Sequence, residues 1–290
     1  MDFGEFRYVN NIDVSMERML EINCKCKEEY NINLKQDDVM INNLENELMG
    51  TLIPIGGGKD SCVTLELLKS FKNDNLCLMI GGKLPSIEAA KIAGYGDKII
   101  HVKRIIDKNL LELNKQGFLN GHTPFSSMLA FLSYLIATLV GKRYIALSNE
   151  SSSNESNVEG EKINHQYSKS FEFEQDFRYY VDKYLKIGVE YFSILRPLNE
   201  LQIAMLFSKS EKYHSIFRSC NVGSKTIPWE WCGNCPKCLF VYIILSPFLY
   251  KDKLIKIFNQ DLFEKQDLLN TFIDLCGYGK TKPFECVRNL

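Results

Sequence analysis

The amino-acid sequence predicts an α/β fold, in which a parallel sheet of five strands is covered by helices on both faces. The first observation is that short apolar runs recur between residues 51 and 195, with segments of helical apolar spacing between them. The second is that these runs are apolar throughout instead of alternating, which is typical of parallel strands buried on both faces. Together the two observations indicate repeated strand–helix units.

The expected elements follow in order along the chain. "TLIPI" (51–55) is a buried strand, and "SCVTLELLKSF" (61–71) has the spacing of a helix. The later strands are "LCLMIGG" (76–82), "KIIHVK" (98–103), "RYIALSN" (143–149) and "VEYFSIL" (189–195). The later helices are "PSIEAAKIAG" (85–94), 123–140 and about 171–185. Ligands of such sheets bind beyond the carboxyl ends of the strands, so the residues that directly follow each strand are the candidate site.

The alternation stops at about Glu211, where a cysteine-rich turn and then helices only follow. We therefore expect a short N-terminal segment at 1–48, an α/β domain at 49–210 and a helical subdomain at 211–290.

Charge and hydropathy narrow the class of partner. The chain has 35 basic and 36 acidic residues with no long run of one sign, which argues against a nucleic-acid or membrane surface. Its first residues, "MDFGEFRYVN", do not resemble a signal peptide, and its most apolar stretch, 128–140, is shorter than the ~20 residues of a membrane span. We expect a cytoplasmic protein with a small-molecule substrate.

A glycine-rich loop joins the first expected strand to its helix. Gly56, Gly57 and Gly58 allow a tight turn that aims several backbone N–H groups at one point, beside the positive end of the helix dipole. Such a loop is a cradle for phosphate. It is not a Walker A loop, because Asp60 follows Lys59 where that motif requires Ser or Thr. An aspartate beside phosphate needs a cation between them, so Asp60 is expected to organise Mg²⁺ or water. The alternative is a plain turn in which Asp60 and Ser61 only cap the helix.

Four cysteines indicate a metal site. Cys232, Cys235 and Cys238 are spaced by two residues in "CGNCPKC", and Cys220 lies shortly upstream. Four thiolates close a tetrahedral site, so Zn²⁺ is the first choice, an iron–sulfur cluster the second and unligated thiols the third. A metal held by four protein ligands has no open position for chemistry, which indicates a structural role.

The glycine loop resembles a known signature. "IGGGKDS" is similar to the "SGGxDS" motif of the PP-loop ATP pyrophosphatases, with Gly56 in place of the serine. The resemblance implies an adenine-nucleotide α-hydrolase-like sheet that binds ATP and Mg²⁺ and splits ATP between the α and β phosphates. It also implies adenine contacts from Gly81, Gly82 and Lys83, and from Asn149 to Ser151. "ILRPLNELQIAMLF" with the cysteines is similar to the 7-cyano-7-deazaguanine synthases, whose zinc site is made of four cysteines.

A closer resemblance covers residues 50 to 287. The blocks "GHTPFSSMLAFLSYLIATLVGKRYIALSNESSSNESNV", "NHQYSKSFEFEQDFRYYV", "FRSCNVGSK" and "KPFEC" look like the ATP-dependent UDP-N-acetylmuramoyl-L-alanyl-L-glutamate epimerases. That family inverts the terminal L-glutamate of a peptidoglycan precursor to D-glutamate and releases AMP and pyrophosphate. Its members carry a longer region before the nucleotide loop. If that region binds the UDP-sugar, the substrate here is another glutamyl peptide.

The resemblance leaves several candidates for proton transfer and charge neutralisation. His165 is the preferred base, because imidazole transfers protons near neutral pH. His122 and Cys286 are alternatives, although "GHTP" also fits the start of a helix and Cys286 also fits a small buried residue. The lysines expected to neutralise pyrophosphate are Lys59, Lys169 and Lys225, with ordinary surface lysines as the alternative for the last two. Glu150 is expected to bind Mg²⁺ or to receive a proton, with an ordinary solvated loop residue as the alternative.

Two other functional classes remain open on the sequence. One is a different adenylating PP-loop enzyme, which forms an amide or a nitrile or thiolates RNA, although the balanced charge argues against RNA. The other is a regulatory nucleotide-binding module without turnover. Formation of AMP with a glutamyl peptide separates an epimerase from the module, and dependence on ammonia or sulfur separates it from the other enzymes.

Overall fold

The computed structural model contains the five-stranded parallel sheet expected from the sequence. It describes residues 6–7, 10–13, 23, 47–82, 84–119, 124–155, 164, 166–220, 222–223 and 229–278. The strands are β1 (Thr51–Pro54), β2 (Leu76–Ile80), β3 (Ile99–Val102), β4 (Tyr144–Leu147) and β5 (Glu190–Ser193). All neighbours pair in parallel in the order β3-β2-β1-β4-β5. The predicted α/β fold class is therefore confirmed.

Helices alternate with these strands and then follow one another towards the C-terminus. The α-helices of the sheet region are α4 (Lys59–Leu67), α5 (Leu84–Ile92), α6 (Lys108–Lys115), α7 (Phe125–Leu139), α8 (Phe171–Tyr180) and α9 (Glu200–Ser208). Those of the C-terminal region are α10 (Pro236–Leu245), α11 (Lys251–Phe258) and α12 (Leu269–Leu275). Short helical turns are η2 (Lys69–Phe71), η3 (Ser151–Asn154), η4 (Tyr167–Lys169), η5 (Val181–Leu185), η6 (Glu211–Tyr213), η8 (Leu262–Glu264) and η9 (Gln266–Leu268).

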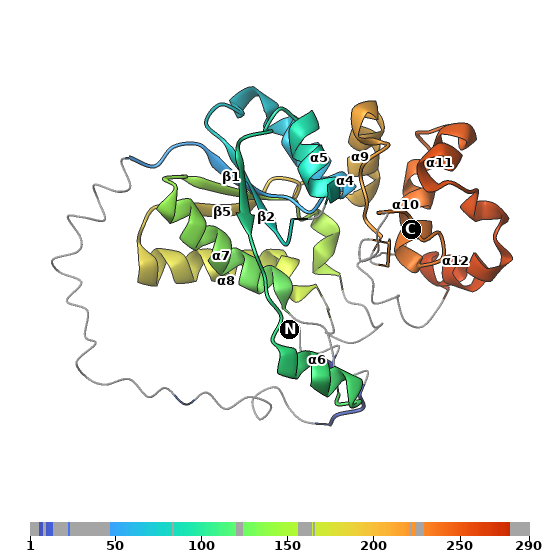
Figure 1. Cartoon of the computed structure of the whole chain (residues 1–290), viewed down its shortest axis with the longest axis horizontal. Coiled ribbons are helices and arrows are strands. Elements are labelled where there is room, and N and C mark those ends of the chain that lie inside the picture. The colour runs from blue at the N-terminus through green and yellow to red at the C-terminus, as the bar shows by residue number, and fades with distance from the viewer. Residues whose placement is uncertain are drawn as a thin grey trace.

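The sheet separates two hydrophobic cores. Successive residues of a strand point to opposite faces, so Leu52 and Ile53 of β1 enter different cores. Helices α7 and α8 cover one face, whereas α4 and α5 cover the other (Figure 1). The second of these cores continues through α9 into α10 and the helices after it, where Phe207, Phe240 and Phe258 are fully buried. One continuous core therefore joins the C-terminal helices to the α4 and α5 face of the sheet.

The order of the strands reverses beside β1, and we call this topological switch point the crevice. The chain moves outward from β1 to β2 and β3, and then returns to the other side of β1 as β4. Leu52 accordingly pairs with Leu76 of β2 and with Ile145 of β4. In open parallel sheets the point where the order reverses is where the connections diverge and ligands bind. Here that point lies between the carboxyl ends of β1 and β4.

Two elements differ from the expectation. Helix α6 was not expected; Asp107 starts it by accepting a hydrogen bond from the Asn109 N–H at 2.8 Å, and none of its residues is buried. The helix expected at 171–185 changes after Tyr180 into the π-helical turn η5, which ends at Lys186 in a left-handed conformation (φ 51°). The helix expected at 123–140 is α7, whose first helical residue is Phe125.

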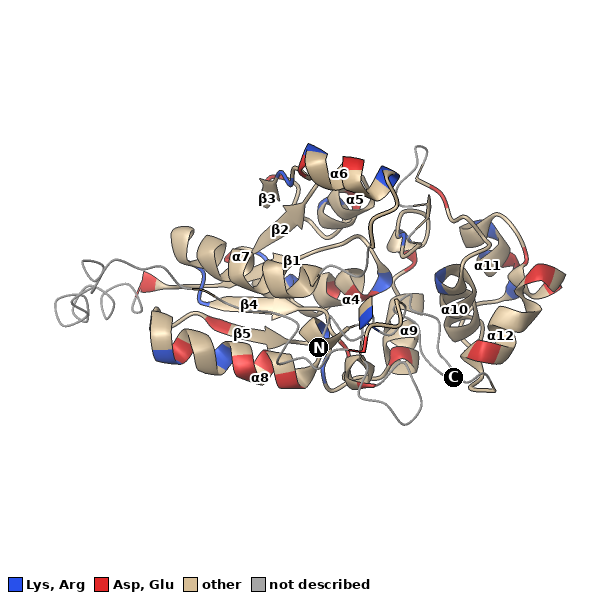
Figure 2. Cartoon of the chain, turned by 90° about the horizontal axis from the view of Figure 1, so that it is seen from below, with Lys and Arg blue, Asp and Glu red and all other residues tan. Residues whose placement is uncertain are grey.

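The surface mixes both signs of charge. Helix α8 carries both signs (Figure 2), with Glu172 and Glu174 in its first turn and Arg178 in its last. Among the described residues, no helix has the length and apolar character that a membrane span requires.

Candidate functional site

The glycine loop follows β1 and leads directly into α4. Gly57 adopts φ +77°, and a Cβ there would lie 2.6 Å from the backbone N of Ser86, so only glycine fits. Gly58 is the N-cap of α4. Gly56 is exposed, and a Cβ on it would meet nothing within 4 Å. The loop is therefore tightly packed at Gly57 and open to solvent at Gly56.

The first turn of α4 has no side-chain cap. Ser61 Oγ donates instead to the Gly58 carbonyl at 3.0 Å, and the Asp60 carboxylate receives the Lys59 ammonium at 2.5 Å. Neither side chain makes a capping hydrogen bond to α4, so these contacts differ from those expected if Asp60 and Ser61 only capped the helix. Among the described residues, no side chain caps this positive end of the helix dipole, which is the end of a helix that binds anions.

Lys59 lies in a buried ion pair that the sequence did not reveal. Its side chain is 3% exposed, and its Nζ lies 2.5 Å from both the Asp60 and the Glu200 carboxylates. Burial alone would lower the pKa of Lys59, but the two carboxylates outweigh it and raise the pKa above its ordinary value. Glu200 sits in the first turn of α9, after a capping box in which Asn199 and Gln202 bond reciprocally. The sequence "NELQ" signals this helix start, but nothing in it signals the partner of Glu200.

The loop after β4 lies beside the glycine loop at the crevice. Thr64 Oγ1 of α4 and Ser148 Oγ are 2.9 Å apart, which joins the two segments. Asn149 Nδ2 donates to Ser193 Oγ at the end of β5 at 3.2 Å. Glu150 is buried. The pKa of Glu200 is raised mainly by its own burial, Lys59 opposes this rise, and the charge of Glu150 adds to it. The predicted residues after β1 and β4 are therefore brought together.

Arg196 organises the same edge of the sheet and was also missed. Its guanidinium donates to the carbonyls of Glu150 and Lys169 at 2.9 and 2.8 Å, and to Glu174 Oε2 at 3.0 Å. It also donates to the hydroxyls of Ser153 and Ser193 at 2.7 and 3.3 Å. One half-buried side chain thus ties the loop after β4 to η4, α8 and β5.

The remaining candidates fall into two groups. Gly81 and Gly82 follow β2 in positive-φ conformations (79° and 59°), and both are exposed. Lys169 is half-buried in η4 and donates to Gln166 Oε1 at 3.1 Å. Five candidates lie outside the described residues: Lys83, His122, His165, Lys225 and Cys286.

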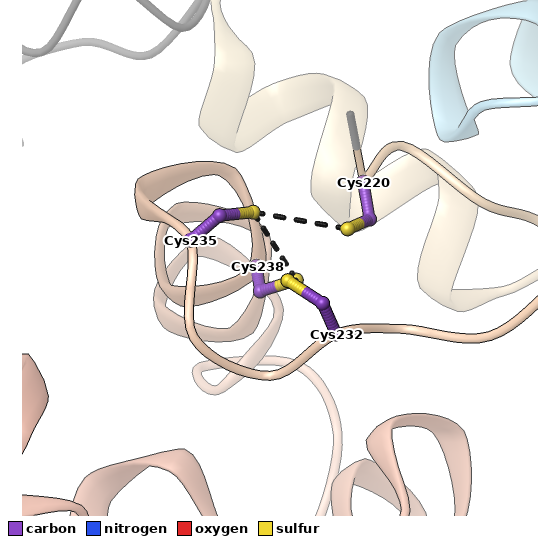
Figure 3. A group of neighbouring side chains, drawn as sticks. All are labelled: Cys220, Cys232, Cys235 and Cys238. Atoms are coloured by element: carbon purple, nitrogen blue, oxygen red, sulfur yellow. Dashed lines mark hydrogen bonds between the residues drawn. The ribbon is translucent and has the colours of Figure 1, made fainter. Parts of the chain in front are cut away.

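The four predicted cysteines converge in the C-terminal region (Figure 3). Their sulfurs all lie within 4.8 Å of one another, with separations of 3.8 Å for Cys220–Cys235, 3.6 Å for Cys232–Cys238 and 3.5 Å for Cys235–Cys238. A tetrahedral ion with metal–sulfur bonds of about 2.3 Å places its sulfurs about 3.8 Å apart. The arrangement therefore fits one metal ion, and it is tighter than thiolates bound to separate irons of a cluster require.

Contacts around the cysteines hold their turns in place. The Gly223 N–H donates to Cys220 Sγ at 3.1 Å, and hydrogen bonds from Cys235 and then Cys238 lower the pKa of Cys220 well below its ordinary value. Lys265 donates to the Gly233 carbonyl at 3.0 Å, between Cys232 and Cys235. Such supporting bonds orient ligands before a metal arrives.

Two models of known protein families match this chain. The MurL N-terminal domain matches residues 2–194, and the MurL C-terminal domain matches residues 216–290. The chain belongs to the MurL family. The first match contains the glycine loop and the loop after β4, and the second contains all four cysteines. The predicted family is confirmed.

Named MurL-type relatives are similar over most of this chain. The chain is 37% identical over 243 residues to the UDP-N-acetyl-alpha-D-muramoyl-L-alanyl-L-glutamate epimerase of Xanthomonas oryzae pv. oryzae, which covers 81% of the chain and 53% of that protein. It is 36% identical to the enzyme of the same name from Salinispora tropica, over 81% of the chain and 52% of the relative. A Micromonospora relative of that name is 33% identical, over 84% of this chain and 55% of the relative. The chain spans about half the length of these curated relatives.

Proposed function

We propose that this chain is an ATP-dependent epimerase of peptidyl glutamate, with UDP-N-acetylmuramoyl-L-alanyl-L-glutamate as its substrate. The observation that carries the proposal is the 33 to 37% identity to three proteins of that name over at least 81% of the chain. The position of the glycine loop at the crevice between β1 and β4 supports ATP as the second substrate, because ligands of open parallel sheets bind there.

In the proposed site the glycine loop and the start of α4 bind the phosphates of ATP. Gly57 and Gly58 aim backbone N–H groups towards the phosphates, and Asp60 and Glu150 are the carboxylates suited to Mg²⁺. Gly81, Gly82 and Asn149 stand at the ends of neighbouring strands, where they suit contacts to the nucleoside. Lys59, held by two carboxylates, keeps the loop anchored and its own positive charge near the phosphates.

Activation by ATP solves the main difficulty of the reaction. Removing the α-proton beside a carboxylate places a second negative charge on the same centre. When the carboxylate oxygen attacks the α-phosphorus and pyrophosphate leaves, the resulting acyl adenylate carries no carboxylate charge, and its carbonyl accepts the electron pair from the broken C–H bond. The amino group is held in a peptide bond, which excludes a Schiff base. A proton delivered to the opposite face and hydrolysis then give the D-glutamyl product and AMP.

The proton-transfer residues are proposed from the sequence. His165 is the preferred base, with His122 and Cys286 as alternatives and Lys169 as a neighbouring cation. The η4 segment that carries Lys169 is fixed by Arg196 to the loop of Glu150, which supports its participation in the same site.

We also propose that Cys220, Cys232, Cys235 and Cys238 hold one structural Zn²⁺. The sulfur separations of 3.5 to 3.8 Å suit a single tetrahedral ion, and four thiolates leave no open coordination position.

The deciding experiment is incubation with ATP and UDP-N-acetylmuramoyl-L-alanyl-L-glutamate in deuterated water, followed by chiral analysis of the glutamate. We expect AMP and pyrophosphate as products, and D-glutamate with solvent deuterium on its α-carbon. Formation of ADP, or inversion without label, overturns the adenylate scheme.

A second arm uses L-alanyl-L-glutamate without the UDP-sugar. Because the chain spans about half the length of its relatives, the UDP-sugar is the part of the substrate whose requirement needs separate proof. Equal turnover of both peptides assigns the activity to a broader class of glutamyl peptides. Failure to form AMP with either peptide favours a nucleotide-binding module.

A further inference from the structure

We propose that the cysteine centre positions the glycine loop through Arg218 and Ser219, so that metal binding and nucleotide binding strengthen one another. This inference rests on the proposed ATP and zinc sites, and it assigns Arg218 and Ser219 as positioning residues. The residues proposed for the two sites lie far apart in the sequence, at 56–61 and at 220–238.

The first observation is direct contact between the two segments. The Arg218 N–H donates to the Gly57 carbonyl at 2.9 Å. A Cβ placed on Gly58 would lie 2.9 Å from Ser219 Oγ, so the serine fills the space that any larger residue at Gly58 would occupy. Ser219 immediately precedes the metal ligand Cys220. The backbone that carries one thiolate is thus also one wall of the glycine loop.

The second observation is that Arg218 joins both arms of the cysteine site. Its Nε donates to the Trp229 carbonyl at 3.0 Å, on the arm that leads to Cys232. Its Nη1 donates to the Phe217 carbonyl at 2.7 Å, on the arm that leads to Cys220. A metal that draws Cys220 and Cys232 together therefore also fixes the segment from which Arg218 reaches Gly57.

The opposite wall of the loop is the start of α5, which carries none of the four cysteines. A Cβ on Gly57 would lie 2.8 Å from the Pro85 carbonyl carbon and 2.6 Å from the Ser86 nitrogen, both at the start of α5. The loop is therefore clamped between α5 and the Arg218–Ser219 segment. Loss of the metal frees one side of the clamp, and the N–H groups that face the phosphates lose their fixed direction. Coupling of this kind is reciprocal, so each ligand changes the affinity of the other by the same factor.

The test on the unaltered protein measures both directions of this coupling. Affinity for a non-hydrolysable ATP analogue is measured with Zn²⁺ bound and after chelation, and release of Zn²⁺ to a chromogenic chelator is measured with and without the analogue. We expect chelation to weaken nucleotide binding by about tenfold, and the analogue to increase the affinity for Zn²⁺ by the same factor. Equal nucleotide affinity with and without Zn²⁺ overturns the inference.

Variants at the contact test its route. Gly58 has φ −87°, which alanine adopts without strain, so the effect of Gly58→Ala arises from its contact with Ser219. We expect Gly58→Ala to weaken nucleotide binding and to speed Zn²⁺ release, and the double variant Gly58→Ala/Ser219→Gly to recover both. Gly96→Ala is the matched control, since a Cβ there meets nothing within 4 Å. If the second substitution rescues neither quantity, Ser219 does not carry the coupling.

The outcomes separate this inference from the proposals beneath it. A protein that binds no ATP analogue in any form contradicts the proposed function, while Zn²⁺ release from Gly58→Ala still reports the loop contact. A protein that binds no Zn²⁺ contradicts this inference and the proposed metal, but leaves ATP binding in place.

Discussion

At the scale of single residues, the buried charges beside the glycine loop determine how firmly the loop is held. Lys59 is almost wholly buried and has two carboxylate partners, of which Glu200 is 12% exposed and Asp60 is 30% exposed. A buried ion pair contributes little net stability, but removal of one partner leaves an uncompensated charge. Glu200 is therefore more important for keeping the loop in place than for overall stability.

We predict that Glu200→Gln lowers the free energy of unfolding by roughly 1–3 kcal/mol, because Asp60 still neutralises Lys59 in part. Glu190→Gln is the control: its partner Arg143 lies 3.5 Å away, and the two side chains are 52% and 36% exposed. That control should change stability by less than about 1 kcal/mol. Urea denaturation of both variants measures the difference, and equal losses would show that the buried pair has no special role.

His214 gives the fold a dependence on pH. It is buried against the Phe207 ring and the Phe207 carbonyl, with Glu211 and Lys253 nearby, and burial lowers its pKa below the ordinary value of 6.5. A histidine kept neutral in the fold is protonated first in the unfolded chain. Its contribution to stability is therefore complete above pH 6.5 and declines as the pH falls below that value.

We predict that the stability difference between the unaltered protein and His214→Gln narrows between pH 8 and pH 5.5. The unaltered protein loses stability over this range through His214, whereas the glutamine variant lacks that loss. Free energies of unfolding at the two pH values provide the measurement. A difference that stays constant would mean that His214 has the same pKa in the folded and unfolded chain.

At the scale of elements, Arg196 is the link between four of them. It contacts the loop after β4, η4, α8 and β5. In its ion pair with Glu174, the Arg196 side chain is 14% exposed and the Glu174 side chain is 5% exposed. A guanidinium presents several donors in a fixed fork, which a lysine ammonium does not reproduce. The positions of Glu150 and Lys169 relative to each other depend on this side chain together with Ser153, whose hydroxyl donates to the Lys169 carbonyl at 2.9 Å.

We predict that Arg196→Lys destabilises the protein by about 1–3 kcal/mol and increases amide exchange around 150–154 and 167–170. The exchange follows from the loss of donors to the Glu150 and Lys169 carbonyls. Arg143→Lys, at an exposed pair, is the control. If the amides of both segments stay as protected in Arg196→Lys as in the unaltered protein, the proposed link is contradicted.

Elements were predictable from the sequence where a local pattern determines them. Strands β1, β2 and β4 are largely buried, so their apolar runs identify them, and the edge strand β3 is mostly apolar although none of its residues is buried. Cys232, Cys235 and Cys238 lie within a single turn and the helix start that follows it. Helix α6 has an apolar side formed by Leu110, Leu111 and Leu113, but it buries none of its residues, so a search for core segments passes over it. Glu200 was missed because its partner Lys59 is 141 residues away, and Arg196 because its partners lie on several distant segments.

At the scale of the whole molecule, the four cysteines lie in the region that connects the C-terminal helices to the sheet. Trp231, beside Cys232, packs between Phe217 and Phe258 with ring centroids 5.1 and 4.5 Å away. Helix α10, which carries Cys238, lies against α9, and α9 lies against α4. A metal there stabilises the folded chain directly, because the site does not exist in the unfolded state.

We predict that the purified protein contains about one Zn²⁺ per chain, and that Cys235→Ser lowers the free energy of unfolding by about 4 kcal/mol or more. Cys276→Ser, a half-buried cysteine outside the cluster, should have a much smaller effect. Elemental analysis and denaturation measure the two quantities. Visible absorbance of an iron–sulfur chromophore would instead assign a cluster to the site.

The central place of β1 in the sheet has a consequence for synthesis on the ribosome. Leu52 of β1 pairs with Leu76 early, but its other neighbour, Ile145 of β4, emerges much later. Until then the nascent sheet exposes one edge of β1, whose four residues are all buried in the finished fold. Open apolar edges of parallel sheets pair readily with other chains. Slow elongation between β3 and β4 should therefore increase aggregation of this protein.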